Sequence, residues 1–151
     1  MTLELKKFSM SHITFKKDEN KGPVVVLIGR RDTGKSFLVR DLLFHHRDIP
    51  LGTVISGTEA GNGFYSDHVP KLFIHDEYSS SIIANILKRQ KVVLKQVNKQ
   101  LATYKKCNID PRAFVILDDC LYDNSWSKDK LMRLLFMNGR HWKIMLIITM
   151  Q

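Results

Sequence analysis

Short apolar runs alternate with longer stretches of helical periodicity along this chain of 151 residues. Four apolar runs rich in β-branched residues predict strands, at 24–28, 51–56, 113–117 and 144–149. Apolar residues at helical spacing predict helices at 35–46, from Ser79 to about Tyr104, and at 128–138. This alternation favours an α/β fold with a mostly parallel sheet, in which the strand at 24–28 is expected to be buried on both faces.

Two further segments complete the pattern. Residues 57–70, GTEAGNGFYSDHVP, are rich in turn formers and predict a surface loop, followed by a short extended piece at 72–74. The last predicted strand ends beside Gln151, so the sheet lacks a covering helix after it. No repeat or linker divides the chain. We therefore expect one partial domain over residues 1–151, truncated at its C-terminus.

Composition and charge narrow the class of protein. A hydrophobic content of 44% is enough for a folded core. The sequence has neither a membrane-spanning apolar run nor a signal peptide, which predicts a soluble, intracellular protein. The net charge of +9 favours a polyanionic partner such as nucleic acid. Cys107 and Cys120 lack a C-x-x-C spacing and are expected to be reduced, buried thiols, and the histidines show no metal-ligand spacing.

The segment GRRDTGKS, which directly follows the apolar run PVVVLIG, has the spacing G-x-x-x-x-G-K-[ST] of a phosphate-binding loop. Its glycines allow backbone N–H groups to point at a phosphate, which also meets the positive end of the following helix. Lys35 would reach the β- and γ-phosphates of ATP, and the Ser36 hydroxyl would bind Mg²⁺. The alternative is a glycine turn with an unrelated lysine. We expect the nucleotide to contact Gly29, Arg30, Arg31, Asp32, Thr33, Gly34, Lys35, Ser36 and Phe37.

The segment AFVILDDC places two adjacent carboxylates at the end of a predicted strand, where ligands bind in open α/β sheets. Asp118 fits a Mg²⁺-binding aspartate, and Asp119 fits a base that orients the water attacking the γ-phosphate. Successive strand residues point to opposite faces, so both can act only if the chain leaves the strand at Asp119. A helix N-cap is the structural alternative. The long separation from the phosphate-binding loop favours an ATPase with its own acidic residue over a small-molecule kinase.

Two more features bear on function. In NGRHWKIMLIITMQ, Arg140 precedes the last strand and Gln151 ends it, so they are candidates for an arginine finger and a γ-phosphate sensor; a solvated surface arginine is the alternative. The stretch from Ser79 to Cys107 contains seven basic residues and no acid, a face that could follow the phosphates of DNA or lie in solvent. The basic residues are Lys88, Arg89, Lys91, Lys95, Lys99, Lys105 and Lys106.

Four segments together resemble a known family, the genome-packaging ATPases of nucleocytoplasmic large DNA viruses (the poxvirus and iridovirus-like group), within the FtsK/HerA superfamily of DNA-pumping motors. They are VVVLIGRRDTGKSFLVRDLLFHHRDIPLGTVISGTEAGNGFY, FIHDEYS, FVILDDC and NGRHWKIMLIITMQ. The resemblance implies a RecA-like P-loop fold and an oligomeric ring that hydrolyses ATP with Mg²⁺ to drive double-stranded DNA into a capsid. It also implies a capsid or portal component as a docking partner, in the host cytoplasm or the virion. The residue roles it implies are nucleotide ligands Lys35 and Ser36, Mg²⁺ aspartate Asp118, catalytic acid Asp119, trans-acting finger Arg140 and sensor Gln151.

The sequence departs from this family in two respects. The wider superfamily usually has glutamate at the position of Asp119, so the shorter side chain must lie closer to the water or act through a second one. The family's sheet also continues past Gln151. Two other interpretations stay open: a cellular or plasmid DNA translocase of the same superfamily, and a nucleotide-gated binding module with little turnover.

Overall fold

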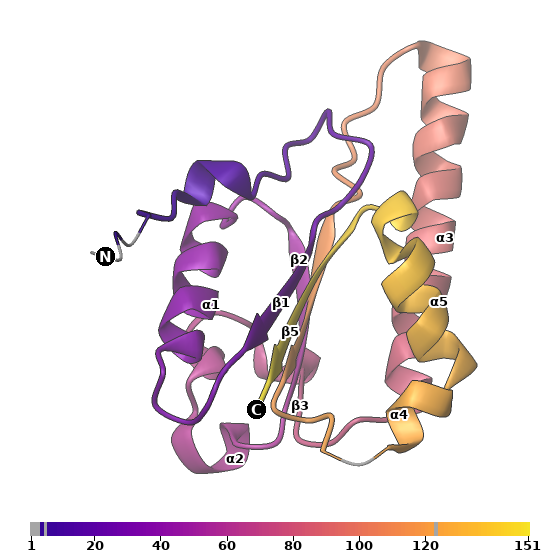
Figure 1. Ribbon diagram of the computed structural model, residues 1–151. Helices are drawn as coiled ribbons and strands as arrows, with labels where there is room; N and C mark the ends of the chain where they lie inside the picture. Colours follow the sequence, from indigo (N-terminus) through magenta and orange to yellow (C-terminus); the bar gives the residue numbers. More distant parts are fainter. Residues whose placement is uncertain (1–3, 5, 123) are drawn as a thin grey trace.

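The computed structural model describes residues 4, 6–122 and 124–151, and its centre is a parallel β-sheet (Figure 1). The strands are ordered β1-β5-β4-β2-β3, and every pairing between neighbours is parallel. This confirms the predicted α/β class with a parallel sheet. The strand bounds are β1 Val24–Ile28, β2 Leu51–Ser56, β3 Ile74–His75, β4 Ala113–Asp118 and β5 Ile144–Met150.

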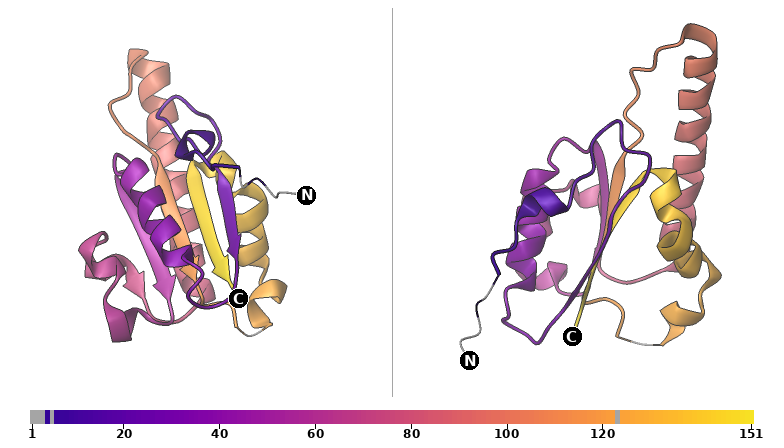
Figure 2. Two further views of the ribbon diagram at one scale, coloured as in Figure 1. Left: turned by 60° about the vertical axis from the view of Figure 1, so that its left-hand side comes forward. Right: turned by 45° about the horizontal axis from the view of Figure 1, so that its top comes forward.

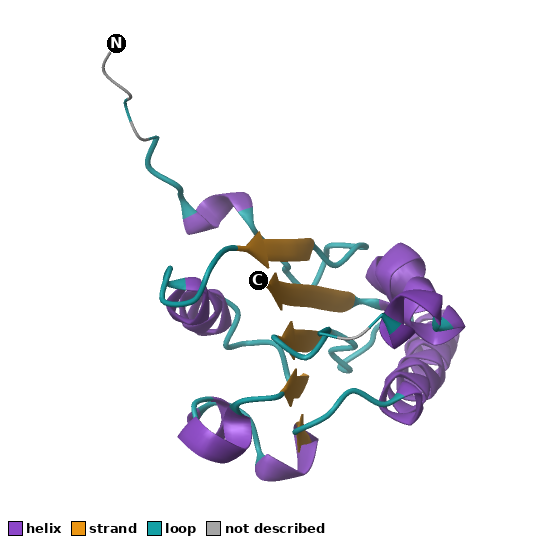
Figure 3. Cartoon of the chain, turned by 60° about the horizontal axis from the view of Figure 1, so that its bottom comes forward, coloured by secondary structure: helices purple, strands orange, loops and turns teal. Residues whose placement is uncertain are grey.

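Helices cover both faces of the sheet, with α1 on one side and α3 and α5 on the other (Figures 1 and 3). The α-helices are α1 Lys35–His45, α2 Glu59–Asn62, α3 Ser80–Tyr104, α4 Ser125–Lys128 and α5 Lys130–Asn138. Short 3₁₀ turns are η1 Met10–His12, η2 Tyr65–Asp67, η3 Lys71–Phe73 and η4 Gly139–Trp142.

Two apolar cores result, one on each side of the sheet. Alternate side chains of a strand point to opposite faces, so β4 supplies Ile116 to the core beneath α1 and Leu117 to the core beneath α3 and α5. Leu42 of α1 is buried in the first core, and Leu135 of α5 is buried in the second. β4 is buried along its whole length because it lies in the interior of the sheet, where helices cover both faces (Figure 3).

The predicted burial of residues 24–28 on both faces is wrong. β1 lies at the edge of the sheet, and its residues alternate between partial burial and exposure. Val25 and Leu27 pack against the core beneath α1, whereas Val24, Val26 and Ile28 are exposed, Ile28 to 77%. An uninterrupted apolar run does not by itself distinguish an edge strand from a central one, which explains the error.

The predicted long helix is confirmed as α3. Its N-cap is Ser79, whose side chain accepts a hydrogen bond from the backbone N–H of Ser81. The buried residues of α3 are Ile83, Ile86, Leu87 and Gln90, all in its N-terminal half. The C-terminal half therefore projects beyond the sheet (Figures 1 and 2).

Other predicted segments differ in detail. The expected helix at 128–138 is divided at Asp129, whose carboxylate caps α5 by accepting a hydrogen bond from the N–H of Leu131. The expected extended piece at 72–74 is mostly the 3₁₀ turn η3. The expected surface loop at 57–70 buries Glu59 and Tyr65 against the body of the protein. Among the described residues, none of the helices has the length and apolar character that crossing a bilayer requires.

Candidate nucleotide-binding site

The phosphate-binding loop connects β1 to α1 in the way that its sequence predicts. The chain turns through two left-handed residues, Asp32 with φ of 56° and Gly34 with φ of 89°. The Gly29 N–H donates to the Met150 carbonyl at 3.1 Å, and the Thr33 hydroxyl donates to the Arg30 carbonyl at 2.7 Å. These bonds hold the loop in place, so that the free N–H groups of the first turn of α1 face its mouth.

Lys35 begins α1 and bends back over the loop. Its Nζ donates to the carbonyls of Gly29 at 2.5 Å and Arg30 at 2.7 Å. A hydrogen bond with one ionised partner is already about twice as strong as a neutral one, and a phosphate would add the attraction of its negative charge to the ammonium group. A phosphate oxygen would therefore compete with these carbonyls for the ammonium group.

The two aspartates end β4 on the same edge of the sheet. Asp118 is the last residue of the strand, and Asp119 has a left-handed φ of 49°, so the chain leaves the strand where the predicted roles require it. Asp118 is buried and accepts two hydrogen bonds from hydroxyl groups. Tyr65 donates to Oδ2 at 2.9 Å, and Thr149 donates to Oδ1 at 2.5 Å.

β5 lies between β1 and β4, so its end falls between the loop and the aspartates. Gln151 follows this strand, and its Nε2 donates to Oδ2 of Asp119 at 3.1 Å. The C-terminal residue lies at the end of the second strand in the row seen in Figure 3. The predicted sensor and the predicted catalytic acid are thus direct neighbours.

A cavity of about 420 Å³ brings these motifs together. Its lining comes from the loop, the start of α1 and the ends of β2, β4 and β5: Arg31, Asp32, Thr33, Gly34, Lys35, Ser36, Phe37, Thr58, Asp118, Asp119, Thr149 and Gln151. Gly29 and Arg30 contribute the carbonyls that hold Lys35.

Three predicted site residues do not line this cavity: Gly29 and Arg30, which lie behind Lys35, and Arg140, which is far away. Arg140 lies in η4, before β5 begins, whereas the cavity lies where β5 ends. The seven residues of β5 rise about 3.3 Å each, which separates Arg140 from its own site by about 20 Å. Its side chain is exposed. Arg140 therefore cannot reach the cavity of its own chain.

Three residues at or beside the cavity were not predicted from the sequence: Thr149, Thr58 and Tyr65. Thr149 is the polar residue of an otherwise apolar strand, and it pairs in register with Asp118, so its position was a usable signal. Thr58 and Tyr65 come from the segment predicted as a surface loop. Nothing in the spacing of that loop predicts which of its side chains turns inward.

The oxygen donors at the cavity fit a hard cation held partly by phosphate and water. The described residues contain no cluster of three or more histidine, cysteine or carboxylate ligands. Mg²⁺ typically binds proteins through one or two side-chain oxygens together with substrate phosphates and water. Ser36 and Asp118 both line the cavity and supply such oxygens. Each carboxylate oxygen of Asp118 has about two acceptor positions, so its two hydroxyl partners leave capacity for a metal-bound water.

Burial keeps two nearby groups protonated. It raises the pKa of Tyr65 well above the ordinary value, and the charge and hydrogen bond of Asp118 raise it further. The Tyr65 hydroxyl therefore acts as a donor to the carboxylate. Burial also raises the pKa of the Cys120 thiol to about 12, with a smaller contribution from Asp118. The described structure contains both cysteines as free thiols; Cys120 is buried, whereas Cys107 is only partly buried.

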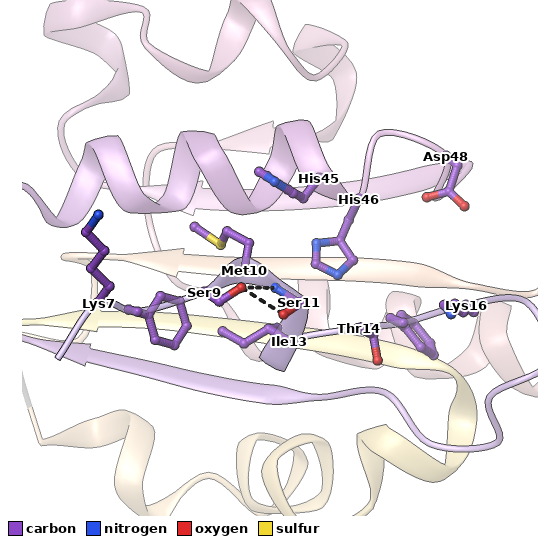
Figure 4. Close-up of a pocket in the computed structure, with 12 residues that line it drawn as sticks. Lys7, Ser9, Met10, Ser11, Ile13, Thr14, Lys16, His45, His46 and Asp48 are labelled. Carbon is purple, nitrogen blue, oxygen red and sulfur yellow. Dashed lines mark hydrogen bonds between the residues drawn. The ribbon is translucent and has the colours of Figure 1, made fainter.

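A larger cavity, of about 720 Å³, lies between residues 7–16 and the C-terminal end of α1 (Figure 4). Ser9 and Ser11 are hydrogen-bonded to each other along its wall, and His45 and His46 extend from the helix end. Both imidazole rings contact helix carbonyls, those of Asp41 and Leu42. The C-terminal end of a helix carries the negative pole of its dipole, so phosphate is favoured at the other end of α1.

The chain has relatives among proteins of large DNA viruses. No protein-family profile matches the chain. It is 45% identical to uncharacterized protein 075L of Invertebrate iridescent virus 6 over 131 residues, and 42% identical to uncharacterized protein L437 of Acanthamoeba polyphaga mimivirus over 131 residues. The matches cover 86% and 85% of this chain. The chain spans about half the length of these relatives, 47% and 45%.

Among solved structures, the chain is similar to the pCW3 conjugation coupling protein TcpA, determined as a monomer with ATPγS. The TM-score is 0.60 at 16% sequence identity, over 87% of this chain and 43% of TcpA. The fold is a RecA-like P-loop fold. At this level of identity, the likeness concerns the fold.

Proposed function

We propose that this chain is the ATP-hydrolysing core of a motor that packages viral double-stranded DNA into a capsid. The observation that carries the proposal is the convergence of Lys35, Asp118, Asp119 and Gln151 on one cavity at the carboxyl ends of parallel strands. We take residues 1–151 as one partial ATPase domain, because the relatives are about twice as long.

Each residue has a role that follows from its position. The loop N–H groups and Lys35 bind the β- and γ-phosphates of ATP. Ser36 and Asp118 hold Mg²⁺, which when bound neutralises charge on the phosphates. Asp119 accepts a hydrogen bond from Gln151 and orients the attacking water. Gln151 lines the same cavity as Asp119 and donates a hydrogen bond to it, which supports a role for Gln151 as the sensor of the terminal phosphate.

Double-stranded DNA is the proposed substrate of the motor. Exposed lysines follow α3 and the turn after it: Lys88, Lys91, Lys95, Lys99, Lys105 and Lys106. A face with this charge neutralises backbone phosphates without reading sequence. The viral relatives and the family resemblance favour genome packaging over other forms of DNA transport. A homo-oligomeric ring would bring the exposed Arg140 of one subunit to the nucleotide of the next, and a capsid or portal component would dock the ring.

One alternative is a cellular or plasmid DNA translocase, which the fold likeness to a conjugation coupling protein favours. A second is a nucleotide-gated binding module. The identity of Asp119 favours this module, because the side chain of aspartate is one methylene shorter than that of glutamate and reaches less far toward an attacking water. The motor hydrolyses ATP over many turnovers, whereas the module binds ATP with little turnover.

The deciding experiment measures steady-state ATP hydrolysis with and without double-stranded DNA. Two proteins are compared: this chain, and a chimera in which this chain replaces the matching region of the longer protein 075L. A motor is expected to hydrolyse ATP over many turnovers, faster with DNA, and to lose turnover when Asp119 is replaced by asparagine. Stoichiometric ATP binding without turnover in both proteins would favour the binding module.

A further inference from the structure

The segment between β2 and β3 inserts a tyrosine into the carboxylate site. Tyr65 is 1% exposed, and its hydroxyl donates to Oδ2 of Asp118 at 2.9 Å across a separation of 53 residues. This contact lies beside the candidate nucleotide-binding cavity of about 420 Å³. The lining of that cavity includes Asp118 and also Thr58, which comes from the same segment as Tyr65. The segment therefore belongs to the site, in contrast to its predicted role as a surface loop.

The backbone of Tyr65 is held by a second buried carboxylate. Glu59 is 8% exposed, and its two oxygens accept hydrogen bonds from the N–H of Tyr65, at 3.1 and 2.9 Å. Oε1 also accepts from the N–H of Ser66 at 2.9 Å. A buried carboxylate is costly unless hydrogen bonds satisfy it, and these bonds do so. The Phe64 ring packs edge-on against the Tyr65 ring, with centroids 5.0 Å apart.

Asp118 is consequently fixed from both sides. Tyr65 donates to one carboxylate oxygen and Thr149 to the other, so rotation of the carboxylate would break one or both bonds. Thr149 is itself held in β5, where its Oγ1 accepts a hydrogen bond from the N–H of Asp119 at 3.1 Å. The orientation of the carboxylate is set by two hydroxyl groups from two different elements.

We infer that Tyr65 is a positioning residue for Asp118, held in place by Glu59, and that it sets the affinity of the site for the divalent cation that accompanies ATP. The inference rests on the proposed nucleotide-binding function. Residues that orient a metal ligand typically change metal affinity by about 10- to 100-fold when they are replaced. Tyr65 would act on the cation through Asp118, so nucleotide bound without the cation should be insensitive to its hydroxyl.

The chain contains a matched control. The hydroxyl of Tyr78 donates to Oδ2 of Asp129 at 2.5 Å, near the start of α5 and away from the cavity lining. Tyr65→Phe and Tyr78→Phe therefore each remove one hydroxyl that is bonded to an aspartate. If the Tyr65 hydroxyl has only a structural role, the two variants should have similar effects on nucleotide binding and its Mg²⁺ dependence.

The test measures binding of a fluorescent ATPγS analogue by this chain at a series of Mg²⁺ concentrations and in EDTA, with thermal unfolding of each variant. Tyr65→Phe is expected to raise the half-saturating Mg²⁺ concentration about 10-fold, with affinity in EDTA unchanged. Tyr78→Phe is expected to leave both quantities unchanged. If Tyr65→Phe does not fold, Glu59→Gln is used, because it weakens the hold on Tyr65 and keeps the phenol.

The possible results separate this inference from the proposed function. Failure of the unmodified chain to bind the analogue would overturn the proposed function, and the inference with it. Mg²⁺-dependent binding by the unmodified chain with the same Mg²⁺ dependence in Tyr65→Phe would overturn the inference alone. Equal losses of affinity for the analogue with Mg²⁺ and in EDTA would also overturn the inference, because they would show that Tyr65 maintains the shape of the cavity and does not act through the cation.

Discussion

The amide of Gln151 donates a hydrogen bond to Oδ2 of Asp119 at 3.1 Å, which joins the end of β5 to the residue that follows β4. The contact exists because β5 lies between the strand of the phosphate-binding loop and the strand of the aspartates. Contact between Gln151 and the terminal phosphate would thus link that phosphate directly to Asp119, the proposed base. Hydrolysis should depend on this pair more than nucleotide binding does.

Asp119→Asn is expected to keep ATP and Mg²⁺ bound and to lower the hydrolysis rate by about 10²- to 10⁴-fold, since an amide cannot accept the proton of the attacking water. Asp118→Asn is expected to act first on Mg²⁺ dependence. Single-turnover hydrolysis and equilibrium binding, measured on the same samples, distinguish the two. Equal losses of nucleotide affinity in both variants would assign the pair to a structural role.

Lys35→Ala is expected to weaken ATP binding about 100-fold or more, because it removes a charge-assisted contact to the phosphates. Its stability should change little, since Nζ contacts only the partly exposed carbonyls of the loop in the absence of nucleotide. Titration calorimetry and thermal unfolding measure the two effects. Lys128→Ala, which alters an exposed lysine of α4, is the control. Unchanged ATP affinity in Lys35→Ala would mean that nucleotide binds elsewhere.

Replacing Lys88, Lys95 and Lys99 with glutamine is expected to flatten the salt dependence of DNA binding. Each lost phosphate contact reduces the slope of log affinity against log salt by about 0.9, so the slope should fall by up to about 3. Lys91 is left unchanged because its Nζ lies 5.2 Å from the centroid of the Trp142 ring. In the control variant, Lys6, Lys7 and Lys16 are replaced with glutamine, which removes the same amount of positive charge outside α3. If both triple variants change the slope equally, α3 is not the DNA-binding face.

Arg112 links three segments and should control stability at low pH. It is fully buried and pairs with Asp110 and Asp48, each at 2.8 Å, while Nη1 donates to the Phe15 carbonyl at 2.5 Å. Burial by itself would raise the pKa of Asp110, but the hydrogen bonds and charge of Arg112 lower it below its ordinary value. This stabilisation is present above the ordinary pKa of an aspartate and is lost as pH falls through the lowered pKa.

Arg112→Met is therefore expected to destabilise the fold by about 3–5 kcal/mol at neutral pH, because it leaves Asp110 without its partner. The variant should also lose less stability than the parent between about pH 5 and pH 2. Urea unfolding at several pH values measures both effects. If the free energies of unfolding of the variant and the parent differ by the same amount at every pH, the Arg112–Asp110 pair does not govern the loss of stability at low pH.

The contrast between α3 and the segment at 57–70 shows what the sequence could predict and why. Elements with a strong period, such as α3, were predicted nearly to the residue, and the spacing of the loop motif predicted a loop between a strand and a helix, as found between β1 and α1. The aspartates were predicted because they end a strand. Tyr65 was not, because a turn-rich segment contains no periodic signal for the direction of its side chains. The edge position of β1 was missed for a related reason, since strand order depends on contacts far apart in sequence.

Arg140 should act on a neighbour's nucleotide, because its exposed side chain lies at the opposite end of β5 from its own site. In the chimera with protein 075L, Arg140→Ala and Lys35→Ala subunits are each expected to be nearly inactive alone. The first would lack the finger, and the second would lack the nucleotide.

Mixing the two variants tests this arrangement directly. Mixed rings contain interfaces at which an intact Arg140 faces an intact Lys35 site, and a trans-acting arginine is typically worth on the order of 10³-fold or more in rate. ATPase activity should therefore partly return when the variants are combined, and should rise and fall with the mixing ratio. Exposed Arg133→Ala in place of Arg140→Ala is the matched control, because it should be active without mixing. Failure of activity to recover in rings shown to contain both variants would rule out a shared site, since at least one interface in such a ring would carry every residue the mechanism requires.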